Sequence, residues 1–253
     1  MIEPFLVLLC GVAAGALNAI GGGGTFVALP ALVAFGVPPV TANAVSRIAL
    51  VPGALASAWV YRRDLVPVGP TSTRALSAAS GVGGAVGAGL LLALPATSFD
   101  AAAPWLLAFA TLILAFGGHL SAAVSTVLGR SVDLSARSVL VAQFFLAVYG
   151  GYFGGAVGIL MVALWRVGLG VDTAISNPMR VTQLGAIFFS ASVLFLVASD
   201  ALEVPLLLVA MLLGAVIGGA AGAHLARRLP AWLLRGLLLA TAVTTTVLYF
   251  LRS

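Results

Sequence analysis

Long apolar stretches follow one another along the whole chain, separated by short breaks that contain arginine, aspartate, glycine or proline. Each stretch is at least about 18 residues long, and a helix needs about 20 mostly apolar residues to cross a bilayer. The strict alternation of apolar and polar residues that marks the strands of a membrane β-barrel is absent. The pattern therefore predicts an all-α polytopic membrane protein. Its apolar segments cover residues 4–35, 38–61, 71–94, 103–120, 137–169, 173–198, 203–226 and 231–251.

Composition and charge exclude a soluble protein. Hydrophobic residues make up 62% of the 253 residues and charged residues 8%, whereas soluble domains are nearer half apolar and a quarter charged. The net charge of +5 comes from arginines that stand singly or in pairs at predicted loops, which is typical of membrane topology and not of a nucleic-acid-binding face. We recognise no nucleophile–base set, phosphate-binding loop or cluster of metal ligands, so we expect neither enzyme activity nor a cofactor or metal.

The sequence contains an internal repeat. Several small and polar residues recur 134 positions later in the chain. These pairs are Gly21 and Gly155, Gly36 and Gly170, and Asn43 and Asn177. A match that includes asparagine as well as glycine indicates a duplication. We therefore expect two transmembrane repeats, which cover residues 1–125 and 135–253.

Charge positions predict how the segments cross the membrane. Arginines flank one set of segment ends, whereas Glu3, Asp100, Asp200 and Glu203 mark the other set. The positive-inside rule places the arginines in the cytoplasm and these carboxylates in the periplasm, with both termini on the periplasmic side of a bacterial inner membrane. The arginines assigned to the cytoplasm are Arg62, Arg63, Arg74, Arg130, Arg137, Arg166, Arg227, Arg228 and Arg235.

The first segment of each predicted repeat must then begin and end on the same side of the membrane. About 32 residues are too few for two crossings, which need nearer 40, so a re-entrant hairpin is expected. Each repeat would combine this hairpin with three full crossings, and the odd number makes the repeats inverted. The glycine clusters would form the hairpin tips near the midplane, where inverted-repeat transporters bind substrate. Alternatively, the glycines only permit close helix packing.

Two arginines, Arg47 and Arg180, remain within predicted membrane segments. Arg47 follows Asn43 by four residues and Arg180 follows Asn177 by three, so each pair shares one helical face. No aspartate or glutamate is available at the same depth, so backbone carbonyls, a position near the interface or an anionic substrate must accommodate the two charges. A guanidinium group matches the oxygens of sulfonate, sulfite, carboxylate or phosphate, and we therefore predict a small anionic substrate.

We expect the substrate site to combine these asparagine–arginine pairs with the glycine clusters and nearby polar residues. Serine and threonine are the weaker candidates, because their hydroxyl groups mostly bond the backbone of their own helix. The predicted site residues are Asn18, Gly22, Gly23, Gly24, Thr25, Asn43, Ser46, Arg47, Gly155, Gly158, Ser176, Asn177, Arg180 and Gln183.

The same region of the sequence resembles a known family. The likeness is carried by residues 21–25 (GGGGT), 29–30 (LP), 36–39 (GVPP), 42–44 (ANA) and 61–63 (YRR), with a weaker echo from Gly154-Gly155 to Asn177-Pro178. In these motifs, and in length and hydropathy, the chain resembles the sulfite exporter TauE/SafE family of membrane permeases for sulfur-containing anions. The resemblance implies export of sulfite or an organosulfonate.

We therefore predict a secondary transporter that exports sulfite or organosulfonate anions across the inner membrane by alternating access. Two alternatives stay open. One is an anion channel or uncoupled pore, which needs no conformational cycle, and the other is an integral-membrane subunit without transport activity. The expected partners are the small anion and the lipid bilayer, with no nucleic acid, and a homodimer is left open.

Overall fold

The computed structural model describes residues 2–128, 134–171, 173–226, 228 and 230–252. The structure is 86% helical, and no strand occurs among the described residues. Six of the described helices are long and apolar enough to cross a membrane, which confirms the predicted all-α polytopic membrane fold. The helices are α1 (Ile2–Gly21), α2 (Thr25–Ala34), α3 (Pro39–Tyr61), α4 (Thr73–Ala93), α5 (Ala96–Leu128), α6 (Ala136–Tyr152), α7 (Val157–Leu169), α8 (Thr173–Ala198), η1 (Asp200–Glu203), α9 (Pro205–Ala226) and α10 (Ala231–Arg252).

One predicted segment differs from the helix that forms. The segment expected at 103–120, with Pro104 near its start, is part of the longer helix α5, which begins at Ala96 and contains Pro104. The helix begins directly after Pro95, whose carbonyl accepts a 2.9 Å hydrogen bond from the backbone N–H of Ser98. Proline costs a membrane helix one backbone hydrogen bond, and neighbouring groups compensate for that loss.

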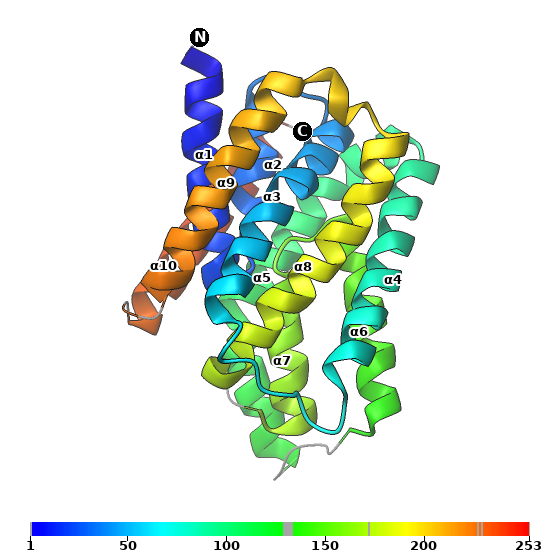
Figure 1. Ribbon diagram of the computed structural model, residues 1–253, viewed down its shortest axis with the longest axis vertical. Coiled ribbons are helices and arrows are strands. Elements are labelled where there is room, and N and C mark those ends of the chain that lie inside the picture. The colour runs from blue at the N-terminus through cyan, green and yellow to red at the C-terminus, as the bar shows by residue number, and fades with distance from the viewer. Residues whose placement is uncertain (1, 129–133, 172, 227, 229, 253) are drawn as a thin grey trace.

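Two helical hairpins enter the helix bundle from opposite ends (Figure 1). α1 runs inward from one end, breaks after Gly21 and continues as α2 toward the same end, while α6 and α7 do the same from the other end. α2 has 10 residues and α7 has 13, fewer than the roughly 20 needed to cross a bilayer. The breaks use left-handed backbone conformations, with φ of +75° at Gly22, +76° at Gly154 and +56° at Ala156.

Glycines set the close packing of the hairpins on their neighbouring helices. α1 packs on α9, where Gly218 lies against the backbone of Val12, and α6 packs on α4, where Gly87 lies against the backbone of Val148. A Cβ at either glycine would collide with that backbone. Small residues at these positions allow the helix backbones to approach each other closely.

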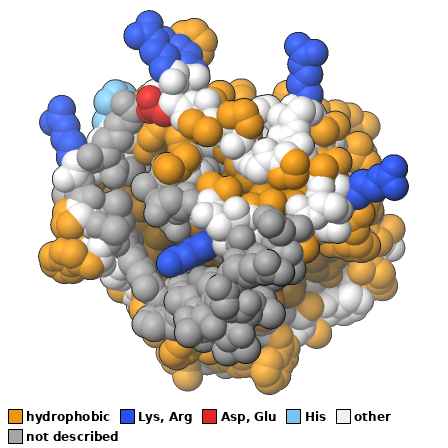
Figure 2. All heavy atoms as spheres, turned by 90° about the horizontal axis from the view of Figure 1, so that it is seen from below, with side chains coloured by type: hydrophobic (Ala, Val, Ile, Leu, Met, Phe, Trp, Pro, Cys, Tyr) orange, Lys and Arg blue, Asp and Glu red, His pale blue; other side chains and the backbone are white. Residues whose placement is uncertain are grey.

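The exposed arginines and most of the described carboxylates lie at opposite ends of the bundle, with Asp64 at the arginine end (Figure 2). The end shown in Figure 2 holds the C-terminal ends of α3, α7 and α9 and the N-terminal ends of α4 and α6, with exposed arginines around its rim. The carboxylates that were assigned to the periplasm are exposed at the opposite end. The exposed arginines near the helix ends of Figure 2 are Arg62, Arg63, Arg74, Arg137, Arg166 and Arg228. Arg130, Arg227 and the side chain of Arg235 lie outside the described residues.

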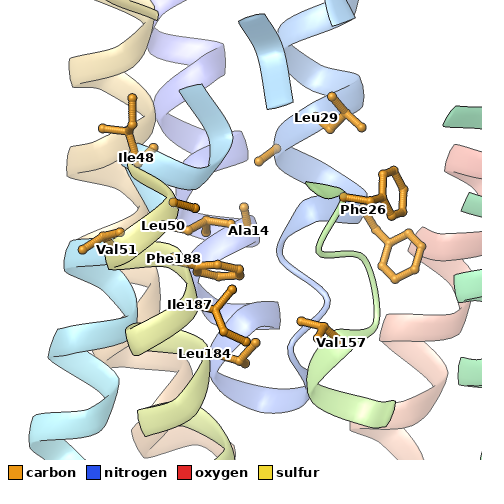
Figure 3. Close-up of a cluster of buried hydrophobic side chains, with 14 of the residues drawn as sticks. Ala14, Phe26, Leu29, Ile48, Leu50, Val51, Val157, Leu184, Ile187 and Phe188 are labelled. Atoms are coloured by element: carbon orange, nitrogen blue, oxygen red, sulfur yellow. The ribbon is translucent and has the colours of Figure 1, made fainter. Parts of the chain in front are cut away.

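Apolar side chains surround the two hairpin breaks. Figure 3 shows Phe188, Ile187 and Leu184 of α8 near the ribbons of both turns, with Val157 at the start of α7 and Phe26 at the start of α2. All five side chains are fully buried. The breaks therefore lie in an apolar interior, where unpaired backbone groups are costly and need defined hydrogen-bond partners.

Candidate functional site

Arg47 lies in α3 beside both hairpin breaks, and its side chain is fully buried. Nη1 donates a 3.0 Å hydrogen bond to the hydroxyl of Thr25 at the start of α2, and Nη2 donates one of 3.0 Å to Oδ1 of Asn43. The guanidinium carbon lies 5.1 Å from the ring centroid of Phe188 in α8, a cation–π contact. Arg47 therefore connects α3 with the first hairpin and with a helix of the second half.

The second hairpin meets Arg47 at a glycine. Gly154 lies in the turn between α6 and α7, and its Cα packs directly against the guanidinium group. A Cβ at this position would collide with Nη1, Cζ and Nη2 of Arg47, and the φ of +76° is also unfavourable for any other residue. Only glycine satisfies both conditions, so Arg47 rests on bare backbone at this turn.

Arg180 in α8 reaches the break of the first hairpin, and its side chain is only 3% exposed. Nη2 donates hydrogen bonds of 2.9 Å to the carbonyl oxygens of Ala19 and Ile20, in the last turn of α1. Nε donates a 3.1 Å hydrogen bond to Oδ1 of Asn177, which also accepts one from Nη2. Arg180 therefore binds the C-terminal end of a broken helix that belongs to the other half of the chain.

The two hairpin turns touch each other at glycines. A Cβ on Gly22 would lie 3.1 Å from the Cα of Gly158 and 3.3 Å from Nη1 of Arg180. A Cβ on Gly158 would lie at the same 3.3 Å from that nitrogen and 3.1 Å from Cδ1 of Leu184. The two glycine clusters therefore meet, and the guanidinium group of Arg180 lies beside their contact.

Both inner helix ends at these breaks are bound by side chains from the other half of the chain. Arg180 binds the end of α1, and Nδ2 of Asn43 donates a 2.7 Å hydrogen bond to the carbonyl of Tyr152 at the end of α6. The last carbonyls of a helix have no intrahelical partner and carry partial negative charge. The donors from α3 and α8 supply these carbonyls with hydrogen-bond partners and so stabilise both breaks.

No described carboxylate balances the two guanidinium charges. Both Arg47 and Arg180 are buried inside the helix bundle, so neither side chain reaches the surface of the protein. Carbonyls, side-chain amides, a hydroxyl and an aromatic ring hold the two groups, and all of these are uncharged. The described carboxylates, all of them exposed, are Glu3, Asp64, Asp100, Asp200 and Glu203. The centre therefore carries a net positive charge.

Several polar atoms near the breaks have unused hydrogen-bonding capacity. A guanidinium group has five N–H donors. Nε of Arg47 is buried without a partner. Oδ1 of Asn18, a buried residue in the last turns of α1, also lacks a partner. Native proteins rarely leave buried donors unsatisfied, so an acceptor at Arg47 is the expected complement.

The remaining predicted polar residues are occupied elsewhere or lie beside the centre. The hydroxyl of Ser46 donates a 2.8 Å hydrogen bond to the backbone carbonyl of Asn43, the local contact expected of a helical serine. Gln183 is directed toward α4, where it accepts a 2.9 Å hydrogen bond from Ser80. Ser176 is buried one turn before Arg180.

The other predicted glycines pack against protein atoms. Gly23 faces the side chain of Leu238 in α10, and Gly24 packs against α1 at Ala14 and Asn18. Gly155 lies beside the ring of Phe153 in its own turn. Their packing keeps both turns compact next to the arginines.

Some residues of this centre were not predicted. They include Phe188 of α8, whose ring lies against the guanidinium group of Arg47. They also include Tyr149 of α6, whose hydroxyl donates a 2.9 Å hydrogen bond to the carbonyl of Gly155. A second polar cluster joins Gln143 of α6 to Ser80 of α4 by a 2.9 Å hydrogen bond. A glutamine in an apolar helix needs hydrogen-bond partners, so these residues could have indicated a buried polar cluster.

The chain was compared with known protein families, curated proteins and solved structures. No curated protein and no solved structure gives a significant match. The sequence model of the sulfite exporter TauE/SafE family matches residues 7–249, a range that includes both hairpins and both buried arginines. Members of this family are membrane transporters and not enzymes. The chain therefore belongs to the sulfite exporter TauE/SafE family.

Proposed function

We propose that this protein is a secondary transporter that exports sulfite or small organosulfonate anions across the inner membrane by alternating access. One observation carries the proposal: two buried guanidinium groups, without a described carboxylate partner, lie where two broken helices meet. An arginine inside a membrane protein is costly and marks a functional site by default. An anion with several oxygens would supply the missing charge and acceptors.

The helix breaks favour the same kind of ligand. α2 begins at Thr25 and α7 at Val157, so the N-terminal end of one short helix lies at each turn. The N-terminal end of a helix carries partial positive charge, which favours an anion. Sulfite and sulfonate groups can accept hydrogen bonds from a guanidinium fork and from backbone N–H groups together. A cation would be repelled by both guanidinium groups.

The proposed alternating access relies on two inverted repeats, residues 1–125 and 135–253. The left-handed positions support this relation, since Gly22 and Ala156 are 134 residues apart, and so are Gly36 and Gly170. Helix packing supports it as well, because α1 and α3 pack on α9, while α6 and α8 pack on α4. Related packing in both halves would let the bundle rock about a fixed site.

We propose that the end with the exposed arginines faces the cytoplasm, which places both termini in the periplasm. An inside-negative membrane potential then drives anions outward, with about 2.3 kcal/mol per charge for each 100 mV. No carboxylate is described among the buried residues, so the proposal assigns the driving force to the potential and not to a titrating acid.

Counterflow in proteoliposomes tests this function. Vesicles loaded with unlabelled sulfite should accumulate labelled sulfite transiently, because a carrier exchanges anions through one alternating site. The exposed Arg74 provides the control: Arg74→Gln should behave as the wild type, while Arg47→Gln should lose counterflow. Rapid flux without counterflow would favour the channel alternative. Absence of flux for sulfite, sulfoacetate and taurine would contradict the proposed substrate class.

A further inference from the structure

The two buried arginines have different partners. Arg180 donates two hydrogen bonds from one nitrogen to the carbonyls of Ala19 and Ile20, whereas Arg47 donates to two side chains and to no backbone carbonyl among the described residues. At the matching helix end, the carbonyl of Tyr152 is bound by Asn43. In the first hairpin an arginine therefore binds the helix end, and in the second hairpin an asparagine takes this place.

The contacts of Arg180 offset much of its charge and fix its orientation. The carbonyls at the end of α1 carry the partial negative charge of the helix dipole, which offsets the guanidinium charge. Asn177 fixes the orientation of the group, because its Oδ1 accepts from both Nε and Nη2. Nη1 lies close to Gly22 and Gly158 at the contact of the two turns. Such contacts are typical of a side chain that holds the end of α1 and the following turn in place.

The contacts of Arg47 leave more of it available. Its acceptors are one hydroxyl, on Thr25, and one amide oxygen, on Asn43, neither of which carries a formal charge. The guanidinium group stacks on the ring of Phe188 and packs against Gly154, and these two contacts fix its plane without occupying its N–H donors. Nε is fully buried and has no partner. A buried charged donor without an acceptor destabilises the protein unless a ligand supplies that acceptor.

We infer that the two arginines divide the work: Arg47 binds the transported anion, and Arg180 positions the end of α1 and the first hairpin turn. The inference rests on the proposed function for the role of Arg47, while the role assigned to Arg180 depends on the hairpin alone. Asn177 acts through Arg180 and is a positioning residue as well. The first half of the chain, which contains Arg47, would therefore supply most of the hydrogen bonds to the anion.

Lysine substitutions separate the two roles, because lysine keeps the charge but loses the planar fork. Two quantities are measured in lipid nanodiscs: the Kd for labelled sulfite, and hydrogen–deuterium exchange of the backbone around residues 18–24. Arg47→Lys should weaken sulfite binding by about 10- to 100-fold, the value of one or two charge-assisted hydrogen bonds, with exchange unchanged. Arg180→Lys should raise exchange by about 10-fold or more and change the Kd by less than about threefold. Arg74→Lys is the matched control and should alter neither.

Asn177→Ala gives a second variant that retains both arginines. It should raise exchange around the first turn and leave the Kd for sulfite near that of the wild type, even if Arg180→Lys does not fold. Equal loss of binding in both lysine variants, with wild-type exchange in each, would overturn the division of roles. Absence of sulfite binding by the wild type would contradict the proposed function and the role of Arg47, and the exchange data would still decide the role of Arg180.

Discussion

Asn43 donates a 2.7 Å hydrogen bond from Nδ2 to the backbone carbonyl of Tyr152, 109 positions further along the chain. The same side chain accepts a 3.0 Å hydrogen bond from Nη2 of Arg47 through its Oδ1 atom. One buried amide therefore holds the end of α6 and orients an arginine in α3. Both capacities of the amide are used, so asparagine cannot be replaced here without loss.

Two substitutions of Asn43 test these contacts: alanine removes both, and aspartate keeps only the acceptor for Arg47. Asn43→Ala should lower the free energy of unfolding by about 1–3 kcal/mol, because it leaves a carbonyl and a guanidinium donor unsatisfied. Asn43→Asp keeps the acceptor for Arg47 but places a carboxylate beside it, so we expect sulfite binding to be lost in a protein that still folds. Denaturation in detergent and binding of labelled sulfite measure the two effects. Tight sulfite binding by Asn43→Asp would contradict the placement of the anion at Arg47.

The contact between Gly154 and Arg47 can be tested against a second glycine of similar conformation. Gly154→Ala should abolish sulfite binding, because the new methyl group would occupy the space of the guanidinium group. Gly36 has a φ of +84° with no atom within 4 Å of an added Cβ, so Gly36→Ala should cost only the conformational penalty, about 1–2 kcal/mol. Thermal unfolding and sulfite binding distinguish the two. Equal effects of both substitutions would show that the contact with Arg47 has no special importance.

Ala156 is the one described residue other than glycine with a positive φ. The left-handed conformation costs an L-residue about 1–2 kcal/mol, and glycine avoids this cost. Glycine also has a larger conformational entropy in the unfolded chain, which offsets part of the stability gained by the substitution. We therefore expect Ala156→Gly to leave the free energy of unfolding unchanged or to raise it by up to about 1 kcal/mol. Ala110→Gly, in the interior of α5, is the control and should be destabilising. A clear loss of stability in Ala156→Gly would mean that its methyl group makes an important contact.

The cluster of glutamines and serines between α4, α6 and α8 predicts unequal effects of two similar substitutions. Gln183 accepts from Ser80 and donates to Ser77, so Gln183→Leu should lower stability by about 1–3 kcal/mol through unsatisfied partners. Gln143 makes one hydrogen bond, to Ser80, and its Oε1 has no partner. Gln143→Leu should therefore cost less, and urea denaturation of the purified variants measures the difference. A larger loss in Gln143→Leu would contradict these assignments.

The apolar pattern predicted the order and approximate bounds of the helices because each segment is a local feature of the sequence. The hairpins could also be predicted, since segment length and arginine positions constrain the path of the chain. The partners of Arg180 could not be predicted. They lie 160 and 161 positions away in α1, and no periodicity relates a guanidinium group to two backbone carbonyls at that separation.

The candidate site was predicted at the level of residue type. Both asparagine–arginine pairs form hydrogen bonds within their helices, as the spacing of three or four residues indicates. The sequence treated the two pairs as equivalent, but Asn43 binds a helix end while Asn177 orients Arg180. Similar side chains in the two halves of the chain take different partners, and the turns differ as well: the first has Gly22 and the second has Gly154 and Ala156 in left-handed conformations.

The most direct test of the central claim is binding of an anion panel to the purified protein, read as a change in melting temperature. A ligand that binds only the folded state stabilises it, by about 2.7 kcal/mol at 100 times its Kd. We predict that sulfite and sulfonates raise the melting temperature while acetate does not, and that Arg47→Gln abolishes the rise while Arg74→Gln retains it. Equal stabilisation of the wild type and Arg47→Gln by sulfite would contradict an anion site at this arginine.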